Sequence, residues 1–392
     1  MMSVVIISAA RTPIGGFQGA LSNVAATDLG AAAIRGALEN GAVSPDAVDE
    51  VLMGCVLPAG LGQAPARQAA LGAGMPQSVP CTTVNKVCGS GMKTVMAAHD
   101  QIIAGSQTLM VAGGMESMSG APYLSMKTRG GARLGHAELK DHMFLDGLED
   151  AYARGTLMGT FAELCAGQYQ FSREAQDDYA LGSLSNALAA QKSGAFEGEI
   201  TGLTVTSRKG DVTVSEDEQP GKAQPDKIPT LRPAFKKDGT VTPANASSIS
   251  DGAAAIVLCS GAEAQARRLT VRARIVGHAS HAQDPAWFTT APVPATQKLL
   301  KRIGWTVDDV DLWEVNEAFA IVPMAFMQDL GIPRNRINVN GGACALGHPI
   351  GASGTRIIVT LLNALEKRDL KRGIAAICIG GGEGTAIAVE RP

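Results

Sequence analysis

An internal repeat constrains the fold of this chain more than any other feature. Residues 84–114 contain a Val-Asn pair, a cysteine motif, a predicted helix and an apolar strand that ends in glycines. Residues 339–382 follow the same order, with a histidine motif in place of the cysteine motif. Strands that alternate with helices are typical of α/β folds. The sequence therefore predicts two copies of one α/β unit, with chance similarity between glycine-rich turns as the alternative.

Other segments complete the two units. Short apolar and β-branched runs predict strands, and apolar residues on a helical period predict helices. The further predicted elements are strands over 4–7, 48–56, 251–258, 273–278 and 312–314 and helices over 26–41 and 294–303. Residues 119–246 do not follow the strand and helix order of the two units. They contain predicted helices over 157–170 and 173–193 and a turn-rich run over 208–243. An insert of this length is usually functional.

Composition argues against several classes of partner and cofactor. The 392 residues carry a formal net charge of -3, so no strong field favours nucleic acid or an anionic membrane. The seven cysteines are odd in number and form no CxxC pair, which argues against a disulfide framework or a zinc site. No Walker or dinucleotide fingerprint suggests ATP or NAD. We therefore expect no metal and no prosthetic group.

Targeting signals are also missing from the sequence. It shows no secretory signal, no peroxisomal tripeptide and no apolar run of about 18 residues that could span a membrane. The cysteine pattern in turn favours a reducing compartment. We therefore expect a cytoplasmic protein with neither a membrane nor a nucleic-acid partner.

Two cysteines and one histidine stand among small residues where a ligand could reach them. Cys88 precedes the predicted helix over 91–104, whose N-terminal dipole would favour a thiolate. His348 lies among glycines and can accept a thiol proton or stabilise a negative oxygen. Cys378 ends a predicted strand, where ligands of α/β folds collect, and could act as an acid or a base. Two thiols with an imidazole predict chemistry on thioesters.

Each of these residues also has a simpler interpretation. Cys88 could be a buried, inert cysteine, His348 a surface turn residue, and Cys378 a small apolar strand residue. Asn316 could position a water molecule or an oxyanion, but it could equally be the N-cap of a helix over 318–330. These alternatives stay open for each residue taken alone.

Four strings taken together resemble the thiolase family closely, and most of all its biosynthetic, short-chain branch. They are Asn85–Gly91, Asn316–Ala320, Gly341–Arg356 and Cys378–Gly384. The similarity runs over nearly the whole chain. It implies duplicated thiolase-type α/β units with mixed five-stranded sheets, layered α-β-α-β-α, and an inserted loop domain. The expected domains are 1–118 with 247–270, the insert 119–246, and 271–392.

The resemblance implies a two-step reaction that makes acetoacetyl-CoA from two acetyl-CoA molecules, or cleaves it with CoA. Cys88 would attack the first acyl-CoA and form an acyl-enzyme, while His348 takes the thiol proton. Cys378 would then remove a proton from the second acetyl-CoA. His348 and a water held by Asn316 would form one oxyanion hole, and the backbone N–H groups of Cys88 and Gly380 the other.

The resemblance also assigns contacts to coenzyme A, which would be a substrate. Segment 240–247 would lie under the pantetheine, and Lys222 would lie near the phosphates. The expected contact and pocket residues are Leu148, Met158, Lys222, Ala244, Ser247, Phe288, Ala318 and Phe319. The chain departs from the usual motifs at Leu157, Phe288 and Glu383, which bear on CoA affinity and acyl chain length.

Three functions compete. The first is a condensing thiolase, of short or of broader acyl chain length. The second is a decarboxylating ketoacyl synthase of the same superfold, which would place a histidine or an asparagine where this chain has Cys378. The third is a non-catalytic, thiolase-like lipid-binding protein, which should lack one of Cys88, His348 and Cys378. The sequence favours the thiolase.

The loop over 127–140 resembles the thiolase loop that joins two dimers into a tetramer. We therefore expect a homotetramer.

Overall fold

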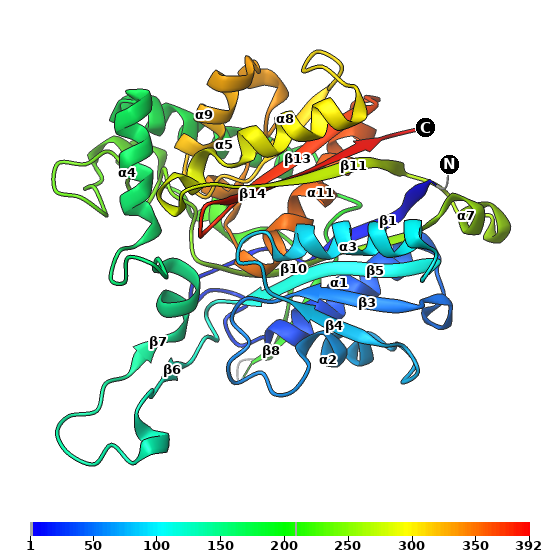
Figure 1. Cartoon of the computed structure of the whole chain (residues 1–392), viewed down its shortest axis with the longest axis horizontal. Helices are drawn as coiled ribbons and strands as arrows, with labels where there is room; N and C mark the ends of the chain where they lie inside the picture. The colour runs from blue at the N-terminus through cyan, green and yellow to red at the C-terminus, as the bar shows by residue number, and fades with distance from the viewer. Residues whose placement is uncertain (1–2, 208–209) are drawn as a thin grey trace.

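Two similar half-sheets, joined at one strand pair, form the centre of the molecule (Figure 1). The computed structural model describes residues 3–207 and 210–392. The first half contributes strands β1 Val4–Arg11, β2 Gly15–Gly16, β3 Glu50–Gly54, β4 Cys81–Val84, β5 Leu109–Ser117 and β10 Ser250–Ser260. Its helices are α1 Ala26–Gly41, η1 Pro45–Ala47, α2 Pro65–Gly72, α3 Ser90–Ala104 and α7 Gly261–Arg267.

The second half repeats this arrangement. Its strands are β11 Ala273–Ala282, β12 Leu312–Val315, β13 Arg372–Ile379 and β14 Glu383–Glu390. Its helices are η5 Pro285–Thr290, α8 Pro292–Ile303, α9 Ile321–Leu330, η6 Arg334–Arg336, α10 Ala343–Leu346 and α11 Ile350–Lys367. The long helix α11 follows the histidine motif, as α3 follows the cysteine motif.

The order of the strands shows the duplication directly. In the first half β4, β3 and β5 are parallel neighbours, and β10 and β1 follow antiparallel. In the second half β12 and β13 are parallel, and β14 and β11 follow antiparallel. Residues 4–6 of β1 pair with 273–275 of β11 and join the halves. The α/β class and the duplication are confirmed, but a single bridge from Trp313 to Ile337 replaces the fifth strand of the second half.

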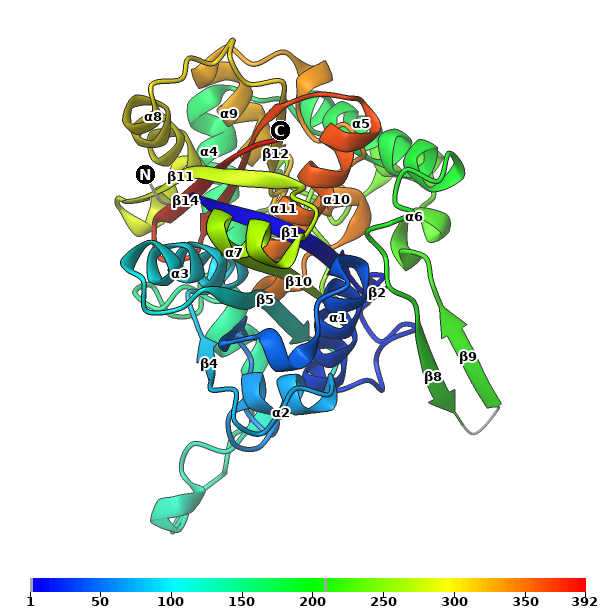
Figure 2. The same cartoon turned by 90° about the vertical axis from the view of Figure 1, so that its right-hand side faces the viewer.

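Helices and sheets form five layers (Figure 2). α1 and α2 cover the outer face of the first half-sheet, α8 and α9 cover that of the second, and α3 and α11 lie between the sheets. Residues 350–365 of α11 are all buried. Its polar side chains Arg356, Thr360 and Asn363 bond to buried partners rather than to water, which is how a helix with polar residues can lie in the interior.

The insert contains short strands and helices on one side of this frame. Its elements are β6 Tyr123–Leu124, η2 Thr128–Gly130, β7 Lys140–Asp141, η3 Phe144–Leu148, α4 Met158–Tyr169, α5 Arg173–Lys192, β8 Leu203–Ser207, β9 Gly210–Val214, α6 Glu218–Lys222 and η4 Pro225–Thr230. The segment around β6 and β7 projects away from the body (Figure 1). Among the described residues, every helix is too short or too polar to cross a bilayer.

Three local features differ from the sequence-based expectation. Strands β4 and β14 were not predicted, since β4 is short and β14 follows a glycine run that reads as the end of an element. Gly381 and Gly382 have φ angles of 92° and 87°, so they turn the chain directly from β13 into β14. Helix α9 begins at Ile321, so the interpretation of Asn316 as its N-cap is wrong.

Candidate active site

Cys88 lies in a tight turn between β4 and α3. Within the turn, the Gly89 N–H donates to Lys86 O at 3.1 Å and the Ser90 N–H donates to Val87 O at 3.0 Å. Val87 has a φ of 47°, which β-branched residues rarely adopt. Strain of this kind persists only where surrounding structure enforces it, and it is common at functional sites. The turn holds Cys88 just before the N-terminal end of α3.

The hairpin between β13 and β14 meets this turn from the second half of the chain. A Cβ on Gly89 would lie 2.4 Å from a β13 side chain, so glycine allows the close approach. Lys86 forms an ion pair with Glu383 at the start of β14. The backbone N–H groups of Gly380 and of Cys88 itself face the Cys88 sulfur. The two cysteine motifs, far apart in the sequence, are therefore neighbours.

His348 lies in the short loop between α10 and α11. Its backbone N–H donates to Ser248 O at 3.1 Å. Its Nδ1 is 2.5 Å from Ser353 Oγ, which itself donates to Pro349 O at 2.9 Å. Since that hydroxyl proton is used, Nδ1 carries the ring proton and donates it. Nε2 lies 3.4 Å from Asn316 Nδ2 and is left as the acceptor that a general base needs.

Asn316 and Cys378 come from the carboxyl ends of the parallel neighbours β12 and β13. The Asn316 N–H donates to Ala376 O at 3.0 Å and continues the ladder between these strands. Both side chains are fully buried. The charge of a Cys88 thiolate acts on Cys378, so the two sulfur atoms are close enough to influence each other.

Burial keeps the ionisable groups of the site neutral. It raises the pKa of Cys88 to about 11, and it raises the pKa of Cys378 well above its usual value, with the Cys88 charge as the next cause. Burial, and then the charge of Arg356, lowers the pKa of His348 to about 3. The resting site therefore holds two thiols and a neutral imidazole.

The position of Cys88 at a helix end does not give it a lowered pKa, because burial raises that pKa to about 11. A helix N-terminus stabilises a negative charge by about 0.3–1 kcal/mol at an exposed position. The net rise of the Cys88 pKa from 9.0 to about 11 corresponds to about 3 kcal/mol against the thiolate. Desolvation therefore outweighs the dipole, and attack by Cys88 requires a base to take its proton.

A largely apolar cavity of about 360 Å³ is lined by Cys88 and His348, whereas the fully buried Cys378 and Asn316 are not among its lining residues. The Ser247 N–H donates to Ala318 O at 3.0 Å, which joins two of the segments that form its wall. Nine of the predicted site residues line the cavity: Cys88, Leu148, Met158, Ser247, Phe288, Ala318, Phe319, His348 and Gly380. Leu157, where the chain departs from the usual motif, lines it as well.

A second cavity of about 340 Å³ adjoins the first and shares Pro243 and Ser248 with it. The other two predicted CoA contacts, Lys222 and Ala244, line this second cavity. Lys222 forms an ion pair with Glu218, and one further lysine lies in the lining. The two predicted groups of contacts therefore lie in neighbouring cavities, one largely apolar and one with ammonium groups.

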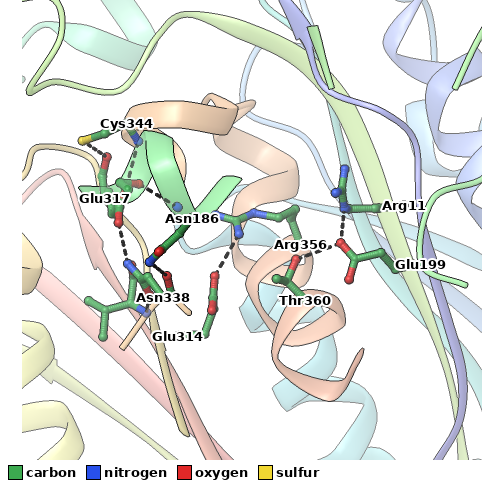
Figure 3. Close-up of polar contacts among 12 residues, drawn as sticks. Arg11, Asn186, Glu199, Glu314, Glu317, Asn338, Cys344, Arg356 and Thr360 are labelled. Carbon is green, nitrogen blue, oxygen red and sulfur yellow. Dashed lines mark hydrogen bonds and ion pairs between the residues drawn. The ribbon is translucent and has the colours of Figure 1, made fainter. Parts of the chain in front are cut away.

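A buried polar network fixes the backbone around the site (Figure 3). Glu317, next to Asn316, accepts hydrogen bonds from Tyr179 Oη at 2.9 Å, Ser183 Oγ at 2.7 Å, Asn338 Nδ2 at 2.8 Å and the Cys344 N–H at 3.0 Å. Glu314 in β12 pairs with Arg356 in α11 at 3.1 Å, and burial raises the pKa of Glu314 to about 8. The network connects β12, which precedes Asn316, with α5 and with α10 and α11, which flank His348.

Sequence reasoning missed two polar residues that support the site, Ser353 and Glu116. Glu116 is buried and accepts hydrogen bonds from the backbone N–H groups of Val56 at 3.0 Å, Leu57 at 3.1 Å and Gly351 at 2.8 Å. Burial raises its pKa to about 7. Ser353 lies inside the Gly341–Arg356 string, and Glu116 follows the two glycines that end a predicted strand. In both cases a polar residue among small or apolar neighbours was the available signal.

Comparison with known proteins agrees with this geometry. Residues 4–262 match the family model "Thiolase, N-terminal domain", and residues 269–391 match "Thiolase, C-terminal domain". The acetyl-CoA acetyltransferase of Cupriavidus necator is 51% identical over 393 aligned positions and covers 100% of both chains. Acetyl-CoA acetyltransferase 2 of Arabidopsis thaliana is 52% identical, over 99% of this chain and 96% of its own.

A solved structure shows the same fold. The crystal structure of the Bacillus anthracis acetyl-CoA acetyltransferase superposes with a TM-score of 0.97 at 42% sequence identity, and it covers 100% of this chain and 99% of that one. The two family models together cover nearly the whole chain, and each covers one half of the duplicated sheet. This chain belongs to the thiolase family.

Proposed function

We propose that this protein is an acetyl-CoA C-acetyltransferase, which condenses two acetyl-CoA molecules to acetoacetyl-CoA and CoA and catalyses the reverse thiolysis. The main support is one arrangement: the Cys88 sulfur faces the Gly380 N–H inside a cavity that His348 also lines, with Cys378 beside it. Acetyl-CoA and CoA would be substrates, and no prosthetic group is needed. Several relatives at about half identity carry the name acetyl-CoA acetyltransferase.

In the first half-reaction, His348 Nε2 takes the proton of Cys88 as the sulfur attacks the thioester carbonyl. The C–S bond to CoA then breaks, and the departing CoA sulfur takes the proton of Cys378. The backbone N–H groups of Cys88 and Gly380 hold the oxyanion. The products are free CoA, an acetyl-Cys88 enzyme, and an imidazolium beside a Cys378 thiolate, so protons and charges balance.

In the second half-reaction, the Cys378 thiolate takes a proton from the methyl carbon of a second acetyl-CoA. The imidazolium of His348, and a water held by Asn316 Oδ1, would stabilise the enolate oxygen. That oxygen of Asn316 accepts no hydrogen bond from any described residue, so it is available for a water. The carbanion attacks acetyl-Cys88, and the departing Cys88 sulfur regains the proton from His348.

The surroundings of Cys378 explain why acylation comes first. In the resting enzyme Cys378 is a neutral thiol, because burial raises its pKa well above the usual value. Acylation of Cys88 leaves Cys378 as a thiolate, and the positive imidazolium formed in the same step favours that thiolate. Condensation should therefore start only from the acetyl-enzyme, which gives ping-pong kinetics.

Trapping of the acetyl-enzyme separates the roles of the two cysteines. After mixing with acetyl-CoA, intact-protein mass spectrometry should show one acetyl group on the wild type and on Cys378→Ala, and none on Cys88→Ser. Condensation by Cys378→Ala should fall by about 10²–10⁴-fold, the usual contribution of a general base. Cys259→Ala, which changes a buried cysteine in the outer core of the first half, is the matched control. Condensation by Cys378→Ala at the wild-type rate would refute the proposal.

An aromatic wall in the first cavity favours short acyl groups. Phe288 is buried against Phe319, with ring centroids 6.4 Å apart, and Phe319 packs edge-on against Phe235 at 6.0 Å. These rings limit the depth available beyond the thioester. Phe288→Met should raise the rate of thiolysis of a six-carbon 3-ketoacyl-CoA relative to the four-carbon substrate. An unchanged ratio would instead favour the alternative of a thiolase with broader chain length.

We also propose a cytoplasmic homotetramer. The projecting segment 119–143 carries exposed apolar side chains, of which Leu134 is 98% exposed and Tyr123 64%. Apolar residues exposed together on a projecting arm are typical of an interface. Light scattering should give a mass near four chains for the wild type and two for a Leu134→Asp variant; equal masses would contradict the role of the arm. Cell fractionation tests the location.

A further inference from the structure

Three side chains outside both cavities converge where the two halves of the chain meet. His99 and Asp100 lie in α3, and His278 lies in β11. His99 Nδ1 is 3.1 Å from Asp100 Oδ1, and His278 Nε2 is 2.8 Å from the same oxygen. The imidazole rings stand edge to face with centroids 5.0 Å apart. One ligand atom from each residue lies within 4.8 Å of the other two.

We propose that His99, Asp100 and His278 form a site for one divalent transition-metal ion, such as Zn²⁺ or Ni²⁺, held by two imidazole nitrogens and a carboxylate. Three protein ligands with positions left for water form a common type of zinc site. Imidazole ligands favour zinc, copper and nickel over magnesium and calcium. The site is independent of the thiol chemistry, and none of its residues lines either cavity.

The geometry requires only small movements to accept an ion. Zinc binds nitrogen and oxygen at about 2.0–2.2 Å, so ligand atoms lie at most about 4.4 Å apart. The side chain of Asp100 is 57% exposed and contacts both rings through one oxygen, whereas the side chains of His99 and His278 are only 16% and 13% exposed. Each imidazole would move its proton to the other ring nitrogen, so that a neutral ligand faces the metal.

The charges around the site favour metals that bind imidazole tightly. Asp100 supplies one negative charge, whereas the positive charge of Lys93 also acts on His278 and opposes a cation. Imidazole nitrogen suits zinc and nickel, whereas magnesium prefers oxygen ligands. A bound ion would link α3, which follows Cys88, to β11 of the other half.

Cobalt titration of the full-length protein tests this site. The Cys88→Ala background removes the reactive thiol as a competing ligand. We expect one Co²⁺ per chain, visible d–d absorption and no sulfur charge-transfer band. His99→Ala and His278→Ala should each weaken binding at least about tenfold. His281→Ala is the matched control on the same strand, and it should bind Co²⁺ like the background protein.

Other outcomes overturn the proposal. Equal affinity in the background protein and in His278→Ala would show that the metal binds elsewhere. One ion per two chains would show a site between chains rather than within one. If the histidine variants fail to fold, Asp100→Asn can be titrated instead, because this exposed side chain adds little to stability. A Co²⁺ affinity of Asp100→Asn equal to that of the background protein would also refute the site.

Discussion

The hydroxyl of Ser353 should control the basicity of His348, and its removal is the sharpest test of the site. The hydroxyl lies 2.5 Å from His348 Nδ1, and both side chains are buried. In Ser353→Ala, the Nδ1–H either loses its acceptor or the ring proton moves to Nε2. In the second case the nitrogen that should take the Cys88 proton is already protonated. Acylation should therefore slow, while the fold is kept.

The magnitude follows from the cost of a buried donor without a partner. That cost is about 1–3 kcal/mol, and about 1.36 kcal/mol changes a rate tenfold. Acylation of Ser353→Ala should therefore be about 5- to 160-fold slower. Rapid quench followed by mass spectrometry measures acetyl-Cys88 formation in a single turnover, so later steps do not obscure the effect. Binding of CoA, measured by calorimetry, should be unchanged.

The same helix offers a matched control. The Thr355 hydroxyl is also buried in α11, two residues further on, and has no hydrogen-bond partner among the described residues. Thr355→Val removes this hydroxyl with almost no change in volume and should acylate at the wild-type rate. The reasoning would be refuted if Ser353→Ala acylated as fast as the wild type. It would also be refuted if Thr355→Val were equally slow.

Three further predictions concern stability. Arg11 is buried and pairs with two buried carboxylates, so Arg11→Met should lower the free energy of unfolding by about 3–5 kcal/mol; an unchanged urea midpoint would contradict this. The folded pKa of His348, about 3, lies below the unfolded value of about 6.5. The neutral His348 therefore stabilises the fold fully above about pH 6.5, and this stability is lost as the pH falls toward 3. Between pH 7 and pH 5 the free energy of unfolding should fall by about 2 kcal/mol. Urea titrations at these two pH values should show no such fall for His348→Asn. A Cβ on Gly114 would lie 2.0 Å from Gly351 O, whereas one on Gly167 meets nothing within 4 Å; only Gly114→Ala should lower the melting temperature.

Local patterns predicted most of the secondary structure. The helix expected over 26–41 has the bounds of α1, and the bounds expected for α3 and α5 each differ from those observed by one residue. Apolar periodicity and turn residues are local signals, so they suffice for elements of this kind. Strand β4, only four residues long and partly buried, carries too weak a pattern.

For the site, the sequence supplied the residue types and the structure supplied their environment. Cys88, His348 and Gly380 were singled out from their motifs, and they line one cavity. Their protonation could not be derived in the same way. The sequence suggested a Cys88 pKa lowered by a helix end, whereas burial among segments far apart in the chain raises it to about 11.

The amino-acid sequence by itself determined the duplicated α/β architecture, its family and the chemical groups available for reaction. These follow from motifs and periodicities that are readable within short windows. Tertiary structure alone decided that β13 of the second half meets the Cys88 turn of the first. It also decided that the Ser353 hydroxyl accepts the hydrogen bond of His348 Nδ1 and that His278 contacts Asp100. Desolvation, charge and hydrogen-bond partners depend on which distant segments pack together, and no local pattern records that packing.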